Sequence, residues 1–227
     1  MSIIPPEAVV RLEPHGAWSE VVLNRPERRN AIVAETVDLL RDVLGKLADD
    51  GSTTAVVLRG EGGVFCSGLD LGQPPGGPGF AAAWAELHLA IAAFPVLVVG
   101  ALERAAVAAG ASLALACDLL VAGDNAFLSV PELAMGRPAP MNTAWLLYKH
   151  GPGRATELVI GGKRRSAADL LAAGLAFEVV PDQDVRGRAC EVASTYAGYD
   201  RAVVVAIKNA IRSGAPRSFE ATLRALS

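Results

Sequence analysis

Short segments rich in β-branched residues alternate with helical patterns along most of the chain, and this alternation limits the folds that it can adopt. Residues 18–23 (WSEVVL), 55–58 (AVVL) and 95–99 (PVLVV) predict strands. A helical pattern at residues 32–47, with Asn30 as its expected N-cap, separates the first two strands. Because strands separated by helices are typical of parallel sheets, we expect an α/β core.

The alternation continues in the middle of the chain. Helical patterns occupy residues 80–94, after a proline- and glycine-rich loop at 72–79 (GQPPGGPG), and residues 109–116. A further strand is expected at residues 119–122, whereas helical patterns dominate from Asn142 onward.

Two later features complete the pattern. One more strand is expected near residues 176–180. Ser166 and Gly174 stand where an N-cap and a C-terminal glycine belong around SAADLLAAG. Earlier in the chain, a strand and a turn are expected at residues 64–68, where the turn has the sequence Cys-Ser-Gly.

Composition narrows the class of protein. The 227 residues, 52% apolar and 20% charged, suit one globular domain over residues 1–227. A net charge of −3 with scattered Lys and Arg argues against nucleic-acid binding. The charge-free run at residues 89–102 is too short to cross a bilayer, and the N-terminus lacks the pattern of a signal peptide. No membrane partner is therefore expected. The three cysteines are widely separated and suit free thiols, so we expect a cytoplasmic protein.

Several chemistries lack their usual residue patterns. His15, His88 and His150 are far apart in the sequence and form no metal-binding spacing, so no metal site is expected. His88 is expected to be partly exposed on the polar face of its helix. No Walker or GxGxxG pattern for phosphate binding and no GxSxG elbow for serine hydrolysis occurs.

Two turns built from small residues are the strongest candidates for a site. They are VFCSGLDL (64–71) and VAAGASLALACD (107–118). Small side chains let a ligand approach the main chain, and the start of a helix offers unpaired N–H groups at its positive end. Two such groups from separate loops can hold an oxygen that becomes negative during a reaction. Tight helix–sheet packing is the alternative explanation of each turn alone.

Five segments in this order resemble the landmarks of the enoyl-CoA hydratase/isomerase family, the crotonases. They are LNRPERRNAI (23–32), VVLRGEGGVFCSGLDL (56–71), AAVAAGASLALACDLLVAG (105–123), AFLSVPELAMG (126–136) and GRATELVIGGKRRSAADLLAAGLAFEVVP (153–181). The resemblance covers residues 9–215 and implies a spiral of β-β-α units over residues 1–175. It also implies a shortened helical trimerisation region at 176–227, and thus a homotrimer or a dimer of trimers.

The resemblance also implies a binding site for an acyl-CoA thioester, with no cofactor other than the coenzyme A of the substrate. The backbone N–H groups of Leu69 and Ala109 match the family's oxyanion hole, where Ala108-Ala109-Gly110 replaces a triple-glycine turn. The residues expected to bind substrate are Arg28, Asn30, Ala31, Ser67, Gly68, Asp70, Leu71, Gly110, Ser112 and Pro131.

The acid–base residues indicate the reaction. Hydratases of this family use two glutamates; Glu132 matches one of them, and Ser112 stands in place of the other. One carboxylate suffices to move a proton along an enolisable thioester, so double-bond isomerisation is the favoured activity. An apolar pocket of Val130, Leu133 and Met135 is expected to raise the pKa of Glu132.

Other departures from the family pattern keep alternatives open. RPAPMNTAW (137–145) replaces a glycine-rich stretch, Glu103-Arg104 replaces Asn-Gly, and the chain ends at Ser227, before a last helical region found in many relatives. A hydratase with weakened activity, a non-catalytic acyl-CoA-binding or partner subunit, and a decarboxylase or thioester hydrolase are the alternatives.

Overall fold

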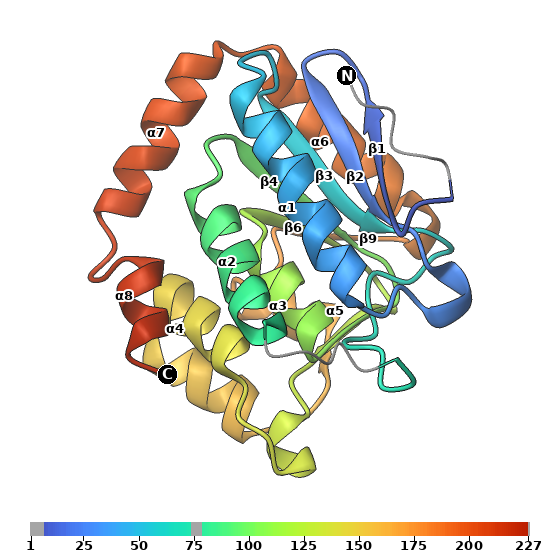
Figure 1. Ribbon diagram of the computed structural model, residues 1–227, viewed down its shortest axis with the longest axis vertical. Helices are drawn as coiled ribbons and strands as arrows, with labels where there is room; N and C mark the ends of the chain where they lie inside the picture. Colours follow the sequence, from blue (N-terminus) through green and yellow to red (C-terminus); the bar gives the residue numbers. More distant parts are fainter. Residues whose placement is uncertain (1–6, 74–78, 227) are drawn as a thin grey trace.

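A six-stranded sheet forms the centre of the computed structural model, which describes residues 7–73 and 79–226 (Figure 1). Its strands, in spatial order, are β1 (Val10–Pro14), β2 (Trp18–Leu23), β3 (Ala55–Gly60), β4 (Leu97–Leu102), β6 (Leu119–Gly123) and β9 (Glu178–Val180). Only β1 and β2 pair antiparallel, and all other neighbours are parallel. The expected parallel α/β core is therefore confirmed.

A second, three-stranded sheet lies beside the first and was not expected. It consists of β5 (Ala105–Val107), β7 (Phe127–Ser129) and β8 (Arg165–Ser166), with β5 and β7 parallel. The strand expected at residues 64–68 runs along β5, but it forms only a single bridge, from Cys66 to Ala106. Most of the loop expected at residues 72–79 lies outside the described residues, since 74–78 are not included.

Eight α-helices surround the sheets in the part of the chain that the structure describes. They are α1 (Ala34–Asp49), α2 (Phe80–Ala93), α3 (Ala109–Ala116), α4 (Pro140–Ala155), α5 (Ala167–Ala172), α6 (Val185–Ala197), α7 (Arg201–Ser213) and α8 (Phe219–Arg224). Short helical turns occupy η1 (Pro26–Arg28), η2 (Glu132–Met135), η3 (Thr156–Ile160) and η4 (Asp182–Asp184). Within the described ranges no helix combines the length and apolar character needed to cross a membrane.

The cap expected for α1 at Asn30 is wrong. The helix begins at Ala34 with Val33 as its N-cap residue, whose N–H donates to the hydroxyl of Thr36. Asn30 is buried and its side chain instead ties two loops together, donating to the carbonyl of Val64 and accepting from the N–H of Arg25. The cap expected at Ser166 is confirmed, because its hydroxyl accepts from the N–H of Asp169.

The main sheet is buried on both faces, which explains its continuous apolar strands. Val56 and Leu58 of β3 belong to the cluster that includes α1, α2 and α3, whereas Ala55 and Val57 pack with α6 on the opposite face. Alternating side chains of one strand thus serve two separate cores. The sheet continues past residue 175, since β9 pairs with β6 and α6 covers β2, β3, β4 and β6 (Figure 1).

Helix α7 lies on the outside of the molecule and is held mainly by polar contacts (Figure 1). None of its residues is classed as buried. Arg201 donates to the carbonyl of Ala48 and Arg212 to that of Phe94, at the C-terminal ends of α1 and α2. Lys208 donates to the chain just before β4. Arg201 and Arg212 thus stabilise carbonyls at helix ends, which have no partner within their own helices and favour positive charge.

A buried ion-pair network links the first hairpin to β3 and α6. The Glu20 carboxylate, 1% exposed, accepts from Arg59 of β3 at 2.5 Å and from Arg186 of α6 at 2.9 Å. Burial alone would raise the pKa of Glu20, but hydrogen bonds and charge from Arg186 and Arg59 outweigh it and lower the pKa to about 2. The stabilisation from this pair is therefore present above the ordinary pKa of a glutamate, and it is lost as the pH falls toward 2.

Replacing Glu20 with Gln is expected to reduce the free energy of unfolding by about 3 kcal/mol, because it removes the nearest charged partner of the buried Arg59 guanidinium and leaves only the longer contacts to Glu13 and Glu61. Urea unfolding at neutral pH measures the loss. Glu191→Gln is the matched control, since Glu191 pairs with Arg188 at a site where its side chain is 67% exposed. Equal midpoints for the two variants would contradict a stabilising role of the buried network.

Candidate functional site

The two small-residue turns lie against each other. The N–H of Cys66 donates to the Ala105 carbonyl at 3.0 Å, and the N–H of Val107 donates back to the Cys66 carbonyl at 3.0 Å. Gly68 has a φ of +104°, and a side-chain carbon at this position would lie 3.0 Å from the Val107 carbonyl oxygen and 3.8 Å from the nitrogen of Ala109. Glycine therefore allows both the backbone angle and the close approach of the two turns.

Among the described residues, neither of the two amides expected to form the oxyanion hole has an acceptor: the N–H groups of Leu69 and Ala109 donate to no group there. Ile32 is bonded to the carbonyl of Gly68 and the N–H of Asp70, so the intervening N–H of Leu69 points away from Ile32. Ala109 is the first residue of α3, where N–H groups have no partner in the helix.

Ala108, rather than Ala109, takes the strained conformation in the second turn. It precedes α3 with φ +50° and ψ −114°, a region that side chains with a Cβ rarely adopt. Ala109 is not among the residues with positive φ. Replacing the middle glycine of the family's turn by Ala109 therefore costs no backbone strain at the donor itself.

Parallel pairing of β5 and β7 brings Glu132 beside this turn. Val107 pairs with Ser129, and the N–H of Ala108 extends the pairing with a bond to the Ser129 carbonyl at 2.9 Å. Pro131 and Glu132 follow directly, with Glu132 beginning η2. Since the carboxyl ends of neighbouring parallel strands meet at one edge, the carboxylate and the Ala108–Gly110 turn lie in the same region.

The Glu132 carboxyl is partly withdrawn from water. Burial raises its pKa, and the donation from Asn142 and a backbone hydrogen bond reduce the rise. The expected pocket is only partly correct: Val130 is buried, but Leu133 and Met135 are 52% and 48% exposed. The carboxyl also contacts α4, through the hydrogen bond from Asn142.

Asn142 is a polar side chain at the site that sequence reasoning missed. It lies in the first turn of α4, is 2% exposed, and donates to the Glu132 carboxylate at 2.9 Å and to the Ala108 carbonyl at 3.1 Å. The only signal in the sequence is an amide side chain between apolar positions, Met141 and Ala144, of a helical pattern. Its partners come from distant segments, which the local pattern does not indicate.

Ser112 is sealed inside the protein. Its hydroxyl donates to the Ala109 carbonyl at 2.8 Å and lies 3.3 Å from Nε2 of His88. The indole N–H of Trp145 donates to Nδ1 of His88 at 2.8 Å, so the neutral ring carries its proton on Nε2 and donates to Ser112. This tautomer cannot act as a base toward the hydroxyl of Ser112.

The expected exposure of His88 is wrong. The side chain is 0% exposed, and burial lowers its pKa to about 3. Trp84 meets its ring edge-on at 4.5 Å. A hydrogen-bonded imidazole therefore serves here as a core residue between α2, α3 and α4.

Among the remaining residues expected to bind substrate, some have exposed side chains and others are buried or half-buried. The side chains of Arg28 and Leu71 are open to solvent, at 50% and 65% exposure. Asp70 is buried; it pairs with Arg25 at 2.9 Å and accepts the N–H of Gly72, so its carboxylate is used within the protein. The others that are buried or half-buried are Asn30, Ala31, Ser67, Gly68, Gly110, Ser112 and Pro131.

These buried positions offer mainly backbone groups to a ligand. The Asn30 side chain is used within the protein, and Ser112 faces His88. A side-chain carbon at Gly110 would collide with the carbonyl oxygen of Cys66. Burial also raises the pKa of Cys66 to about 12, so its thiol stays protonated at neutral pH.

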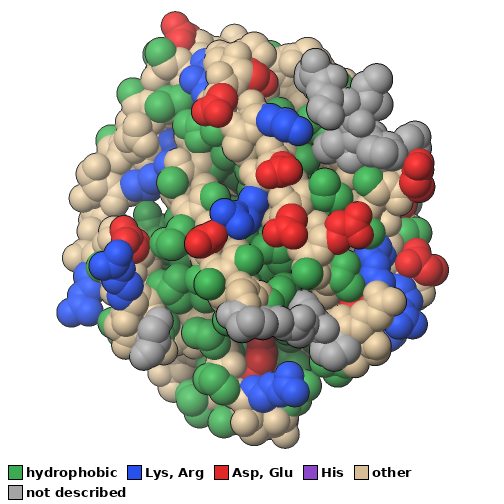
Figure 2. Space-filling view, in the orientation of Figure 1, with side chains coloured by type: hydrophobic (Ala, Val, Ile, Leu, Met, Phe, Trp, Pro, Cys, Tyr) green, Lys and Arg blue, Asp and Glu red, His purple; other side chains and the backbone are tan. Residues whose placement is uncertain are grey.

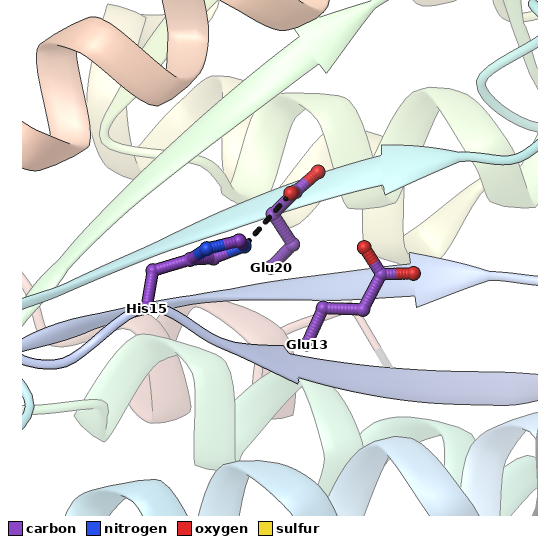
Figure 3. A group of neighbouring side chains, drawn as sticks. All are labelled: Glu13, His15 and Glu20. Carbon is purple, nitrogen blue, oxygen red and sulfur yellow. Dashed lines mark hydrogen bonds and ion pairs between the residues drawn. The ribbon is translucent and has the colours of Figure 1, made fainter.

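One cluster outside this region resembles a metal site. Glu13, His15 and Glu20 gather on the first hairpin, where His15 points at Glu20 (Figure 3). Both carboxylates are held by arginines: Arg59 and Arg186 each pair with Glu13 and Glu20. Cations already occupy the carboxylate oxygens, so this cluster is best explained as part of the ion-pair network.

Charged side chains do not gather by sign on the face that Figure 2 shows. Lys and Arg side chains are interspersed with Asp and Glu there. Within the charge run at residues 163–165, Arg164 lies over the ring of Phe127 at 4.3 Å and Arg165 pairs with Glu157. Two members of that run thus have partners within the protein.

Comparison with known proteins gives a family match over most of the chain. The family model described as enoyl-CoA hydratase/isomerase matches residues 15–226. "Probable enoyl-CoA hydratase echA6" of Mycobacterium tuberculosis is 35% identical over 198 residues, covering 85% of this chain and 76% of the relative.

Two solved structures are similar over nearly the whole chain. Pseudomonas aeruginosa PA4980 has a TM-score of 0.86 at 29% identity and covers 98% of both chains. A monofunctional enoyl CoA isomerase from M. smegmatis has a TM-score of 0.78 at 30% identity, covering 91% of this chain and 93% of that one.

Ala108→Gly is expected to raise the free energy of unfolding by about 1 kcal/mol, because glycine adopts the positive φ without strain. Thermal or urea unfolding measures the change. Ala114→Gly, inside α3, is the control and is expected to lower stability, since its backbone is already helical. Destabilisation by both substitutions would contradict strain at Ala108.

Proposed function

This chain belongs to the enoyl-CoA hydratase/isomerase family, and we propose that within this family of acyl-CoA enzymes it is an enoyl-CoA isomerase that uses Glu132 alone to move a proton. One observation carries the proposal. A single carboxyl, Glu132, lies half-buried beside the turn that bears the free N–H of Ala109. The position of the second glutamate of hydratases is occupied by the sealed hydroxyl of Ser112.

The proposed reaction needs one base and one oxyanion site. Glu132 takes a proton from C2 of a 3-enoyl-CoA, and the electrons move onto the thioester oxygen to give a dienolate. The N–H groups of Leu69 and Ala109 stabilise this oxygen as its negative charge develops. The protonated Glu132 then returns the proton to C4, which leaves a C2=C3 double bond and no net change in composition.

The environment of Glu132 suits both steps. Because burial raises its pKa, the carboxylate is a stronger base than a solvated glutamate, and its acid form is a weaker acid that still donates near neutral pH. Activity is expected to fall as the pH drops below this raised pKa, since the carboxylate is then protonated before it meets the substrate. Hydration would need a second group to activate or deliver water, and Ser112 is a poor one.

Glu132→Gln is expected to lower the rate of isomerisation at least about 100-fold, because the amide cannot accept the proton. The assay follows formation of the conjugated 2-enoyl thioester from a purified 3-enoyl-CoA. Glu86→Gln is the matched control, since Glu86 is an exposed glutamate of α2 that pairs with Arg41. Equal rates for wild type and Glu132→Gln would refute the assignment.

Two further measurements distinguish the alternative functions. Conversion of a 2-enoyl-CoA to its 3-hydroxy product, without isomerisation, would indicate a hydratase. Tight binding of CoA esters by calorimetry without turnover would indicate a binding or partner subunit. The strained Ala108 and the lost second glutamate are the observations that favour this second candidate.

We propose in addition that the chain assembles with copies of itself, as a trimer or a pair of trimers. The support is an apolar groove of about 660 Å³ between α7 and the body of the protein. Val203, Ile207 and Ile211 of α7 line it and are 54%, 57% and 71% exposed. Residues four apart share one helix face, so these form a continuous apolar stripe that a neighbouring subunit would cover.

Ile207→Asp is expected to shift the protein toward single chains, because a carboxylate in this stripe would be desolvated by the neighbouring subunit. Light scattering after size-exclusion chromatography measures the mass. Asn209→Asp, at an exposed position of the same helix, is the control. An unchanged assembly in Ile207→Asp would place the interface elsewhere.

A further inference from the structure

Asn142 connects the Glu132 carboxylate with the turn that carries the N–H of Ala109. We infer that Asn142 is a positioning residue that holds Glu132 and the Ala108–Ala109 peptide in fixed register, so that Oε2 of Glu132 is the oxygen that carries the proton. This inference rests on the proposed function of Glu132 and adds to it the residue that orients the base and the atom that reacts.

The orientation of the Asn142 amide follows from its partners. Its nitrogen lies 2.9 Å from Oε1 of Glu132 and 3.1 Å from the carbonyl oxygen of Ala108. A carbonyl oxygen accepts only, and an ionised carboxylate accepts only. The nitrogen must therefore face them, because the opposite orientation would place the amide oxygen against two acceptors. Both N–H bonds of Asn142 are used in this way.

One of these contacts acts on the oxyanion site directly. The carbonyl of Ala108 and the N–H of Ala109 belong to the same planar peptide unit, so fixing one fixes the direction of the other. The same carbonyl also accepts from the N–H of Ser112 at 3.1 Å. Two donors on this oxygen polarise the peptide and strengthen its N–H as a donor to a negative oxygen.

The hydrogen bond from Asn142 to Glu132 gives the two carboxylate oxygens different roles. Oε1 is occupied by Asn142, whereas Oε2 is buried without a partner among the described residues. A buried acceptor without a partner is costly unless a ligand or a proton completes it. Oε2 is thus the oxygen available for a proton of the substrate.

No ionised side chain of the described residues contributes to the pKa shift of Glu132. Burial raises the pKa, and the bond from Asn142 is the one side-chain contribution that lowers it. Removing that donor destabilises the ionised carboxylate relative to the protonated form, so the pKa of Glu132 should rise further. A purely structural role in packing α4 would leave this titration unchanged.

Asn142→Ala and Asn142→Asp test the inference. In both variants the acidic limb of the kcat/KM profile is expected to move to higher pH, and more so in Asn142→Asp, where a second carboxyl replaces the donor. The value of kcat should fall about 10- to 100-fold as the peptide and the base lose their alignment, with KM little changed. Asn142→Asp keeps the shape of the side chain, so it covers a failure of the alanine variant to fold.

A second measurement is independent of turnover. Infrared difference spectra recorded across a pH titration report the protonation of the Glu132 carboxyl, whose band is assigned by its loss in Glu132→Gln. Asn209→Ala is the matched control, since it removes the same amide from an exposed position on α7. In wild type and in Asn209→Ala the band should titrate at the same pH, and at higher pH in both Asn142 variants.

The outcomes separate this inference from the proposed function. If the Glu132 band shifts as expected but wild type converts no 3-enoyl-CoA, the positioning role stands and the isomerase assignment fails. If wild type isomerises the substrate but neither the band nor the acidic limb moves in the Asn142 variants, the positioning role is overturned. A rise in KM with unchanged kcat would likewise overturn it, because it would indicate binding rather than alignment.

Discussion

The close approach of two backbone turns is the constraint on which the site depends. Residues 65–68 run along β5 and approach the start of α3 closely at Gly68 and Gly110. Gly110 packs directly on the carbonyl of Cys66, and Gly68 lies against the Val107 carbonyl. A Cβ at either position would push the turns apart, and with them the amides of Leu69 and Ala109. Small residues at these positions thus set the distance between the main chains of the two turns.

Helix α4 holds the first turn of α3 through two separate polar routes. Asn142 donates to the Ala108 carbonyl, whereas Trp145, one turn further on, donates to His88, which in turn donates to Ser112 and so reaches the Ala109 carbonyl. Each route is buried, where hydrogen bonds are stronger and an unpaired group is costly. The peptide units at the start of α3 are therefore fixed by α4 as well as by their own helix.

The sequence predicted the elements with a strong local pattern. The bounds of β2 and α3 are those expected from residues 18–23 and 109–116, because a turn-forming sequence follows the first segment and the second is a charge-free run of mostly small residues. The strands β5, β7 and β8 escaped prediction because two or three residues carry no periodicity. The Asn30 cap failed because a tertiary contact with Val64 outweighed the local preference for capping.

At the candidate site, too, features with a local sequence pattern were predicted and features that depend on contacts between distant segments were not. The two turns carry local motifs of small residues, whereas Glu132 was assigned its role from the resemblance to known landmarks, and the roles of all three stay predictions. The burial of His88 and the contacts of Asn142 were missed because their partners lie 24 or more residues away for His88 and 10 and 34 residues away for Asn142. Such contacts depend on the packing of α2, α3 and α4, which a single sequence does not display.

The burial of position 112 has a consequence for chemistry that composition alone does not suggest. Ser112 is enclosed by His88, whose Nε2–H points at it, and by the backbone of Ala109. A longer carboxylate there would have to displace this imidazole or draw its proton, and an ionised group in so dry a place is costly without a partner. The core has closed around the serine, with Trp145 stacked on Phe219 behind the histidine at 4.0 Å. A carboxylate at position 112 is therefore disfavoured by the whole layer of packing around that position.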